Sequence, residues 1–555
     1  MSKELDAMTT EELLAVIQDQ AKQLESKKKW LYWNDQQEEA QKQLEDCFPV
    51  LARQIDKDVI HGGNNHLLIE GENLHALMDL HATHKGKIGI IYIDPPYNTG
   101  NKDFTYNDSY VDKEDGFKKS KWLSFMRNRL VIAKGLMTDD GVIFISIDDR
   151  MLYELKLLMD QIFGETNFVA NFVWKKKRKG SHLSNAVCNI HEYVLCYKRQ
   201  GDIKLSLPED INADTAYYPL YNASNPQGQL SFPGNWLEIK LPDGTYKAGE
   251  YGKQQLHNDI IVINGIITND FTISGHYRYS QDTVNGFFNN KRRIIVSKDL
   301  NMRLVVEDER VKNIKSILTK EAYNIGTNED GDAELREIFG EKKFDFPKPV
   351  SLLEKLIQSY GDPDATVLDF FAGSGTTGHA VLNLNQNEGM NLQFIMVTNN
   401  ENGICEDITH PRIKKVMDQQ QDGNLRYFQV GLVPKGNCLD ESKLIIAENT
   451  EPIAQIDSNM FGIVEQNERF SIYQSDTNEF AAVLKQEIYW EELKAFIEEK
   501  GLSNIKVYVC SFSDDNYSDC FGNENCANLT EKVLGSFKRS GIKDIRVNTP
   551  SAEEN

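Results

Sequence analysis

The chain has 555 residues, with 62 Lys and Arg against 84 Asp and Glu and a formal net charge of -22 at pH 7. Hydrophobic residues make up 40% and aromatic residues 10%, which is enough to form a core and excludes disorder as the main state. The length corresponds to about three or four domains, or to one enlarged domain with insertions. The acidic balance excludes a protein that coats nucleic acid by charge alone, whereas an enzyme acting on DNA needs only a local basic channel.

Several common classes of protein are disfavoured by what the sequence lacks. It contains no run of about 18 apolar residues, so no membrane-spanning helix is expected. Residues 1–14 are acidic and polar and lack the basic-then-apolar pattern of a secretory signal. The eight cysteines include no Cys-x-x-Cys pair, which disfavours a zinc knuckle and a disulfide scaffold. We therefore expect a cytoplasmic protein without a metal site.

The predicted elements begin with a helical arm over residues 1–58, rich in Glu, Gln and Lys, which is either a solvated helix or a docking or dimer element. From residue 59 to 200, short apolar runs alternate with amphipathic segments. This alternation predicts a largely parallel sheet with helices on its faces. The predicted strands are 88–93, 142–147 and 193–197, and the predicted helices are 122–137 and 152–163, the second ending at Gly164.

The pattern changes again in the second half of the chain. Residues 201–340 are rich in Asn, Gly, Asp and Tyr, which indicates a separate β-rich or mixed insert. The α/β pattern resumes at Pro349 with a predicted helix over 351–357 and predicted strands over 366–368 and 393–397. Residues 431–555 form a mixed C-terminal domain in which we recognise no motif.

The segment Asp94-Pro95-Pro96-Tyr97 directly follows the predicted strand 88–93, where catalytic groups of open α/β sheets lie. The exocyclic amine of adenine is a poor nucleophile because its lone pair is delocalised into the ring. Asp94 and the carbonyl of Pro95 can accept its two N–H groups. The two prolines stiffen the loop, and Tyr97 offers a flat face to a base rotated out of the double helix. We assign catalytic roles to these four residues, with an ordinary turn as the alternative.

A second motif, from Asp369 to Gly378, follows the predicted strand 366–368. Its glycines at positions 373, 375 and 378 let the backbone approach a ligand closely at the start of a helix. Taken alone, this spacing also fits a nicotinamide or flavin site, with Glu401, 23 residues after Gly378, near the position of a ribose-binding acid. A Walker loop fits less well because His379 stands where lysine is needed. A tight turn without a ligand is the remaining alternative.

The two motifs together favour S-adenosylmethionine over a dinucleotide. A loop that presents an amine needs an alkyl donor, and a glycine turn at a strand end can hold an adenosyl group. A dehydrogenase would give the segment 94–97 no role. Methylation of cytosine C5 normally needs a thiolate from a Pro-Cys dipeptide, which this chain lacks. Transfer of a methyl group to an exocyclic amine is therefore favoured.

In these motifs and their order, the chain resembles the adenine-specific DNA amino-methyltransferases of the permuted class, in which the catalytic loop precedes the cofactor loop. It resembles most of all the modification subunits of type III restriction–modification systems. The stretches that carry the resemblance are Leu68–Leu74, Ile91–Gly100, Asp140–Asp149, His191–Tyr193, Phe346–Ser351 and Leu368–Gly378.

The resemblance implies a circularly permuted, Rossmann-like α/β sheet built from residues 59–200 and 341–430. The insert 201–340 would be the target-recognition domain, between the helical arm and the mixed C-terminal domain. It also implies a set of residues that line or close over S-adenosylmethionine, with Glu401 the weakest member. These are Asp369, Phe371, Ala372, Gly373, Gly375, Phe346, Lys348, Pro349 and Glu401.

Two basic runs are candidates for phosphate contacts, with solvated surface charge as the alternative. They are Lys175-Lys176-Lys177-Arg178-Lys179 and Lys291-Arg292-Arg293. We expect methylation of adenine N6 in double-stranded DNA by base flipping, in a homodimer that works with a helicase–nuclease restriction subunit. The alternatives are a solitary adenine methyltransferase, a cytosine-N4 methyltransferase, a recognition subunit without catalysis, and an enzyme acting on RNA or protein amines.

Overall fold

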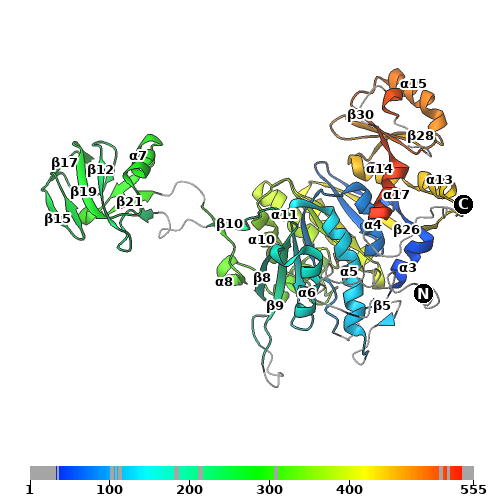
Figure 1. Ribbon diagram of the computed structural model, residues 1–555, viewed down its shortest axis with the longest axis horizontal. Coiled ribbons are helices and arrows are strands. Elements are labelled where there is room, and N and C mark those ends of the chain that lie inside the picture. The colour runs from blue at the N-terminus through cyan, green and yellow to red at the C-terminus, as the bar shows by residue number, and fades with distance from the viewer. Residues whose placement is uncertain are drawn as a thin grey trace, which may run out of the picture. The chain divides into compact units, whose positions relative to one another are not determined.

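The computed structural model describes residues 33, 37–99, 105–106, 109–110, 115–180, 187–209, 217–305, 310–511, 517–521 and 526–539 (Figure 1). It divides the chain into two compact units, Met1–Leu205 with Ile314–Asn555, and Ser206–Asn313. Most of the helical arm expected at the N-terminus lies outside the described residues.

The first unit is built on a sheet that has eleven strands within the described residues. They are β1 (Cys47–Arg53), β2 (Val59–Ile60), β3 (Asn65–Glu70), β4 (Ile88–Ile93), β7 (Met137–Ile147), β8 (Phe168–Lys175), β9 (His191–Lys198), β23 (Ile317–Leu318), β24 (Thr366–Asp369), β25 (Gln393–Thr398) and β26 (Asn424–Pro434). The order is β1-β26-β3-β25-β24-β4-β7-β9-β8-β23, with β2 paired to β26. The run from β26 to β7 is parallel, and so is the pair of β8 and β23. β1 pairs antiparallel with β26, and β9 pairs antiparallel with both β7 and β8. The sheet is therefore mixed, with a parallel centre.

Helices cover both faces of this sheet. One core cluster is formed with α4 (Asn73–Thr83), α5 (Lys118–Leu136) and α6 (Leu152–Phe163), and the other with α10 (Val350–Tyr360), α11 (Thr376–Glu388) and α12 (His410–Gln420). The remaining helices of this part of the unit are α3 (Glu39–Asp46), α8 (Lys320–Tyr323) and α9 (Asn328–Phe339). None of the helices in the described ranges is long and apolar enough to span a bilayer.

Strand β4 illustrates why the predicted strands form. Every residue of β4 is buried, and alternate side chains enter opposite cores: Ile91 and Ile93 face one cluster, Ile90 and Tyr92 the other. A strand buried on both faces has a continuous apolar sequence, unlike a strand with one solvated face. The predicted strands and helices of the α/β region are confirmed, with ends that differ by a few residues.

The prediction of helix through residue 58 is wrong in its last part. Residues 47–53 form β1, which pairs antiparallel with β26 and buries Phe48 and Leu51 in the core. The segment contains Pro49, which disfavours the interior of a helix, and its backbone groups pair with β26, a strand nearly 400 residues later. The small hairpin of β5 (Thr105–Tyr106) and β6 (Ser109–Tyr110) was also not predicted.

The second unit, Ser206–Asn313, is β-rich, as the composition of this region predicted. Its larger sheets surround one core cluster that includes Leu230, Ile273 and Ile294. Residues 314–340, which we included in the insert, belong to the first unit. The elements are β10 (Ser206–Glu209), β11 (Tyr217–Pro219), β12 (Gln227–Phe232), β13 (Glu238–Ile239), β14 (Gly244–Tyr246), β15 (Gly249–Tyr251), β16 (Gln254–Leu256), β17 (Ile260–Ile263), β18 (Ile266–Ile267), β19 (Phe271–His276), α7 (Gln281–Asn289), β20 (Ile294–Val296), β21 (Met302–Val305) and β22 (Arg310–Asn313).

The C-terminal part of the first unit has a sheet of its own, in the order β27-β28-β29-β30-β31. One face of this sheet has a separate core, and the other joins the core of the main sheet through Tyr473, Val483 and Tyr508. The elements are α13 (Leu439–Asn449), α14 (Glu451–Ser458), β27 (Gly462–Gln466), β28 (Phe470–Gln474), β29 (Phe480–Leu484), α15 (Trp490–Lys500), β30 (Ile505–Val509), α16 (Ser518–Phe521), β31 (Cys526–Asn528) and α17 (Leu529–Arg539).

Candidate active site

Two neighbouring strands bring the two sequence motifs to the same edge of the main sheet. β4 and β24 are parallel and adjacent, with Ile90 opposite Val367 and Ile91 opposite Leu368. Asp94 follows the carboxyl end of β4, and Asp369 is the last residue of β24. Ligands of open α/β sheets bind outside the carboxyl ends of the strands, so this edge is the expected place for a site.

A cavity lies at this edge, and residues of both motifs line it. Asp94 contributes from the first motif, and the turn after β24 contributes a run of backbone and small side chains. Its walls also include the segment before α10 and one residue of β4. The lining residues are Tyr92, Asp94, Phe344, Phe346, Pro347, Lys348, Leu353, Asp369, Phe371, Ala372, Gly373, Ser374, Thr376 and Thr377.

Asp94 is the centre of a network of hydrogen bonds and ion pairs. Its Oδ2 accepts from Lys348 Nζ at 2.7 Å, and its Oδ1 accepts from Tyr97 Oη at 2.8 Å. Tyr97 Oη also lies 3.2 Å from Glu192 Oε2. Glu192 accepts from Lys176 Nζ at 2.9 Å and lies 3.5 Å from Lys348 Nζ. Lys348 Nζ also donates to Tyr97 Oη at 3.1 Å, so two carboxylates and one ammonium group surround this hydroxyl.

The opposite charges of this network keep its lysine and its glutamate in their charged forms. Burial by itself would lower the pKa of Lys348, but Asp94 and Glu192 outweigh it and raise that pKa. Burial opposes the charge of Glu192 as well, yet Lys348 and Lys176 hold its pKa below the usual value. Burial, followed by the charge of Asp94, raises the pKa of Tyr97. At neutral pH the lysine is an ammonium, the glutamate a carboxylate and the tyrosine a neutral hydroxyl.

The loop that follows β4 is held by hydrogen bonds from neighbouring elements. Trp122 Nε1 of α5 donates to the carbonyl of Pro96 at 2.7 Å. Asn98, which has a left-handed backbone (φ 54°), donates its amide to the carbonyl of Lys118 at 3.2 Å. Beneath the loop, Tyr92 and Ser146 share a hydrogen bond of 2.8 Å between β4 and β7. These contacts fix the direction in which Asp94 leaves β4.

The turn after β24 is held by backbone geometry. Gly373 and Gly375 have φ of 49° and 79°, values that favour glycine. Gly378 has another reason to be glycine, because a Cβ there would lie 2.8 Å from side-chain atoms of Ile413 and Met396. The third glycine of the motif thus serves the packing of α11 on the sheet, and the first two shape the turn.

Asp369 has polar but uncharged partners. One oxygen accepts from the backbone N–H of Phe371 at 2.9 Å and the other from Thr377 Oγ1. Burial is the main cause that raises the pKa of Asp369 to about 7, and these two hydrogen bonds only partly offset it. A cation bound beside this carboxylate would favour its charged form.

The lining fits S-adenosylmethionine chemically. Two carboxyl groups, those of Asp94 and Asp369, line the cavity and suit a ligand that carries a sulfonium and an ammonium group. Phe344, Phe346 and Phe371 supply aromatic surface for an adenosyl group. The first two glycines of the turn let the backbone come close to the ligand. Both the charge and the apolar surface of the cavity therefore suit this cofactor.

The structure brings together only part of the predicted set. Asp94, Phe346, Lys348, Asp369, Phe371, Ala372 and Gly373 line the cavity, whereas Pro95, Pro96, Tyr97, Pro349, Gly375 and Glu401 do not. Glu401 is exposed in a short 3-10 turn after β25. Phe346 is 70% exposed and has a φ of 54°, a strained conformation for a bulky residue.

Residues 88–410, more than half of the chain, match the family described as DNA methylase, which comprises the N6 and N4 enzymes. The chain belongs to the N6/N4 DNA methylase family. The resemblance drawn from its sequence motifs is thereby confirmed at the level of the family.

Relatives of this DNA methylase include two type III modification subunits. The StyLTI Mod subunit of Salmonella typhimurium is 35% identical over 375 residues, which cover 60% of this chain and 52% of that protein. The EcoP15I Mod subunit of Escherichia coli is 30% identical over 454 residues, 70% of this chain and 68% of that protein. The chain thus spans about half the length of the first of these relatives. A putative DNA modification methylase of Thermus thermophilus, solved with S-adenosyl-L-methionine, has a TM-score of 0.32 and 11% identity, covering 65% of this chain and 99% of that one.

Several residues of this site were not predicted as site residues. Five that line the cavity lie in or beside the stretches 346–351 and 369–378, namely Pro347, Leu353, Ser374, Thr376 and Thr377. Four more lie elsewhere in the chain. Tyr92 and Phe344 line the cavity, Glu192 contacts Tyr97 and Lys348, and the ring centre of Trp174 lies 5.8 Å from Lys348 Nζ. Glu192 lies in the stretch His191–Tyr193, which carries part of the family resemblance, so the sequence contained a signal for it. The others were hidden by their apolar or aromatic character, which is typical of a core.

The residues of the first basic run, 175–179, lie partly in the site and partly on the surface. Lys176 is bound to Glu192, Lys175 pairs with Glu321 at 3.7 Å, and Arg178 pairs with Asp330. Arg178 and Lys179 are exposed. In the second unit, Lys291 is exposed and Arg293 pairs with Glu238. The first run therefore reaches from the catalytic network to solvent.

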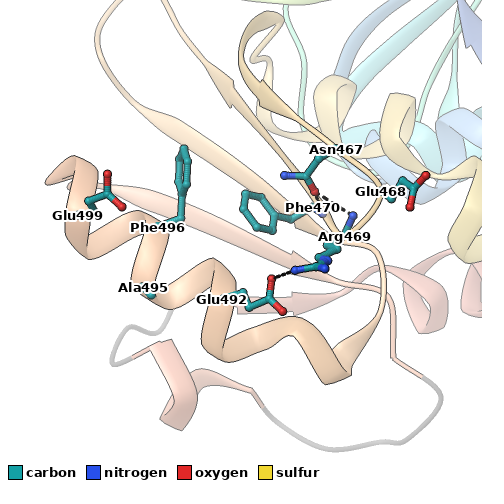
Figure 2. A pocket seen from close by; sticks show the side chains of 8 residues that line it. All are labelled: Asn467, Glu468, Arg469, Phe470, Glu492, Ala495, Phe496 and Glu499. Atoms are coloured by element: carbon teal, nitrogen blue, oxygen red, sulfur yellow. Dashed lines mark hydrogen bonds and ion pairs between the residues drawn. The ribbon is translucent and has the colours of Figure 1, made fainter.

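Another hollow lies in the C-terminal sheet of this DNA methylase, between α15 and the turn before β28 (Figure 2). Arg469 pairs with Glu492 across it, and the rings of Phe470 and Phe496 lie 5.4 Å apart. No residue of either sequence motif lines it.

Proposed function

We propose that this chain is a site-specific DNA methyltransferase that transfers a methyl group from S-adenosylmethionine to adenine N6 in double-stranded DNA. One observation carries the proposal: the carboxylate of Asp94 and the glycine turn around Gly373 line the same cavity. An acceptor for an amine and a turn suited to an adenosyl sulfonium ligand thus face one space.

The residues divide the work. Asp94 and the carbonyl of Pro95 accept the two N–H groups of the target amine and hold its lone pair toward the cavity. Tyr97 stacks on the flipped base, and Trp122 keeps the loop rigid through its hydrogen bond to Pro96. S-adenosylmethionine, when bound, supplies an electrophilic methyl group on its sulfonium. Asp94 stabilises the positive charge that develops on the amine nitrogen as the nitrogen–carbon bond forms and the sulfur–carbon bond breaks to leave a thioether. The methylated amine then loses one proton to solvent.

The second unit, Ser206–Asn313, would read the target sequence, and the basic runs would neutralise phosphates. We further propose that the protein is the modification subunit of a type III system and acts as a homodimer with a helicase–nuclease partner. The similarity to two type III Mod subunits supports the membership of a type III system, and the homodimer remains an expectation.

Expression in a methylation-deficient bacterial host, followed by single-molecule sequencing of its DNA, tests the activity and identifies the base. We expect N6-methyladenine at one position of a short asymmetric motif, and no modification with an Asp94→Ala chain. Detection of N4-methylcytosine at a motif would change the proposed target base from adenine to cytosine. Unmodified DNA alongside well-folded protein would refute the proposed activity.

Affinity purification of the chain from its native host tests the restriction complex. Retention of a helicase–nuclease polypeptide in stoichiometric amount supports a type III subunit. Recovery of the methylating chain alone supports the solitary enzyme instead.

A further inference from the structure

Both oxygens of Asp94 already have a donor. Lys348 Nζ lies 2.7 Å from Oδ2 and Tyr97 Oη lies 2.8 Å from Oδ1. In the proposed function, an N–H of the target amine must bind this same carboxylate. The lysine ammonium and the target amine are both N–H donors, so they compete for Asp94. A lysine that held Asp94 tightly would oppose capture of the base.

Glu192 offers Lys348 an alternative partner. Its Oε2 already pairs with Lys348 Nζ at 3.5 Å, and a small shift of the ammonium away from Asp94 would shorten this ion pair to hydrogen-bond distance. The rings of Tyr97 and Trp174, whose centres are 5.3 and 5.8 Å from Nζ, surround the ammonium. The side chains of Lys348 and Glu192 are both 8% exposed, so a shifted ammonium would stay inside this cage.

The hydroxyl of Tyr97 also has a choice between the two carboxylates. Its hydroxyl has one hydrogen and two carboxylates within reach, Asp94 at 2.8 Å and Glu192 at 3.2 Å. It can donate to only one of them at a time. Lys176, bound to Glu192 Oε1 at 2.9 Å, fixes the position of that second acceptor.

We infer that Glu192 is a positioning residue that takes over Lys348 when the target amine binds Asp94. The inference rests on the proposed function. It has an electrostatic reason besides the competition for a lone pair. Methyl transfer places positive charge on the amine nitrogen beside Asp94, and an ammonium on the same carboxylate opposes that charge. A shift of Lys348 toward Glu192 weakens this opposition without leaving a buried charge unpaired.

The test measures single-turnover methyl transfer by the full chain at saturating S-adenosylmethionine, on a duplex that contains the mapped motif. We expect Glu192→Gln to slow transfer about tenfold, because Lys348 then has no second carboxylate. We expect most of this loss to disappear on a duplex whose target base faces an abasic site, because an unpaired base is easier to capture. In a Lys348→Met background, Glu192→Gln should cause no additional loss, since the competitor is gone.

The matched control is Asp160→Asn. Asp160 accepts from Tyr197 Oη at 2.6 Å and from Lys156 Nζ at 2.7 Å. Asp160 and Lys156 lie in α6, Tyr197 lies in β9, the strand of Glu192, and none of the three lines the cavity. This variant should transfer at the rate of the unaltered chain. Melting temperatures of all variants check folding.

The inference is overturned if Glu192→Gln transfers as fast as the unaltered chain, or if it loses the same factor with and without Lys348. Should Lys348→Met fail to fold, the abasic duplex decides: a Glu192→Gln loss that persists there overturns the inference, and recovery supports it. Failure of the unaltered chain to transfer any methyl group refutes the proposed function itself, which separates the two outcomes.

Discussion

The loops after β4 and after β24 both start from an aspartate at the same edge of one sheet, yet the two aspartates have different hydrogen-bond partners. Asp94 is bound by an ammonium and a tyrosine hydroxyl in a network of four charged groups. Asp369 is bound by one backbone N–H and one threonine hydroxyl, and burial raises its pKa to about 7. Residue type and position in the sheet therefore do not fix the role of a carboxylate. Its partners do.

In the proposed function, this difference separates the residue that takes part in the reaction from the residue that binds the cofactor. A carboxylate with exchangeable cationic partners suits a group that must receive and release an amine. A buried carboxylate with fixed neutral partners suits a group that binds a positively charged cofactor. The variants below, from the largest expected effect to the smallest, test whether the two loops are divided in this way.

Asp94→Ala should reduce methyl transfer at least about 1000-fold, because the amine loses its acceptor and the developing charge loses its counterion. Binding of S-adenosylmethionine, measured by titration calorimetry, should change little. Loss of cofactor binding with transfer intact at saturating cofactor would reverse the roles of the two loops.

Asp369→Asn should show the opposite pattern. We expect the Kd for S-adenosylmethionine to rise about tenfold to 100-fold, with much of the rate restored at saturating cofactor. A variant whose transfer stays abolished at saturating cofactor would contradict the division.

The same variant should change the pH dependence of stability. Burial raises the pKa of Asp369 from its usual 3.8 to about 7, so between these values the folded chain holds a proton that the unfolded chain has released. This residue therefore makes the folded state less stable as pH rises toward 7 and has a constant effect above it. Denaturant unfolding at pH 5, 6, 7 and 8 should show Asp369→Asn gaining stability relative to the unaltered chain up to pH 7, by a few kcal/mol at most. If the unfolding free energies of the two proteins differ by the same amount at every pH, burial does not shift the pKa of Asp369.

Gly375→Ala tests the backbone of the glycine turn after β24. Its φ is 79°, and a Cβ would lie 3.2 Å from Thr409 Cγ2, so we expect a loss of about 1–2 kcal/mol in unfolding free energy and weaker cofactor binding. Gly389→Ala is the matched control, since Gly389 ends α11 with a φ of 65° and nothing within 4 Å of its Cβ position. It should lose about 1 kcal/mol and keep cofactor affinity. Equal cofactor binding by both variants would argue against a role of this turn in the site.

Lys179→Ala should have the smallest effect. Lys179 is exposed at the end of the first basic run. If it contacts a phosphate, DNA affinity falls a few-fold and the slope of log K against log salt decreases by about one unit. Lys500, exposed at the end of α15, supplies the control Lys500→Ala, for which the slope should not change. Identical slopes for both variants would remove Lys179 from the DNA interface.

The sequence alone determined much of this protein. Continuous apolar runs such as Ile88–Ile93 specify strands buried on both faces, and motifs placed at the ends of two such strands predicted a shared site. The order of the motifs predicted the family before any comparison. Glycine spacing predicted the turn, since φ values of 49° and 79° at Gly373 and Gly375 favour that residue.

The tertiary structure decided what depends on contacts between distant residues. Residues 47–53 became a strand because β26 pairs with them, although their local sequence continues a predicted helix. Glu192 entered the site because β9 carries it within 3.5 Å of Lys348, a residue 156 positions later in the chain. Local sequence encodes periodicity and backbone preference, whereas the pairing of charges across a sheet edge depends on how the whole chain packs.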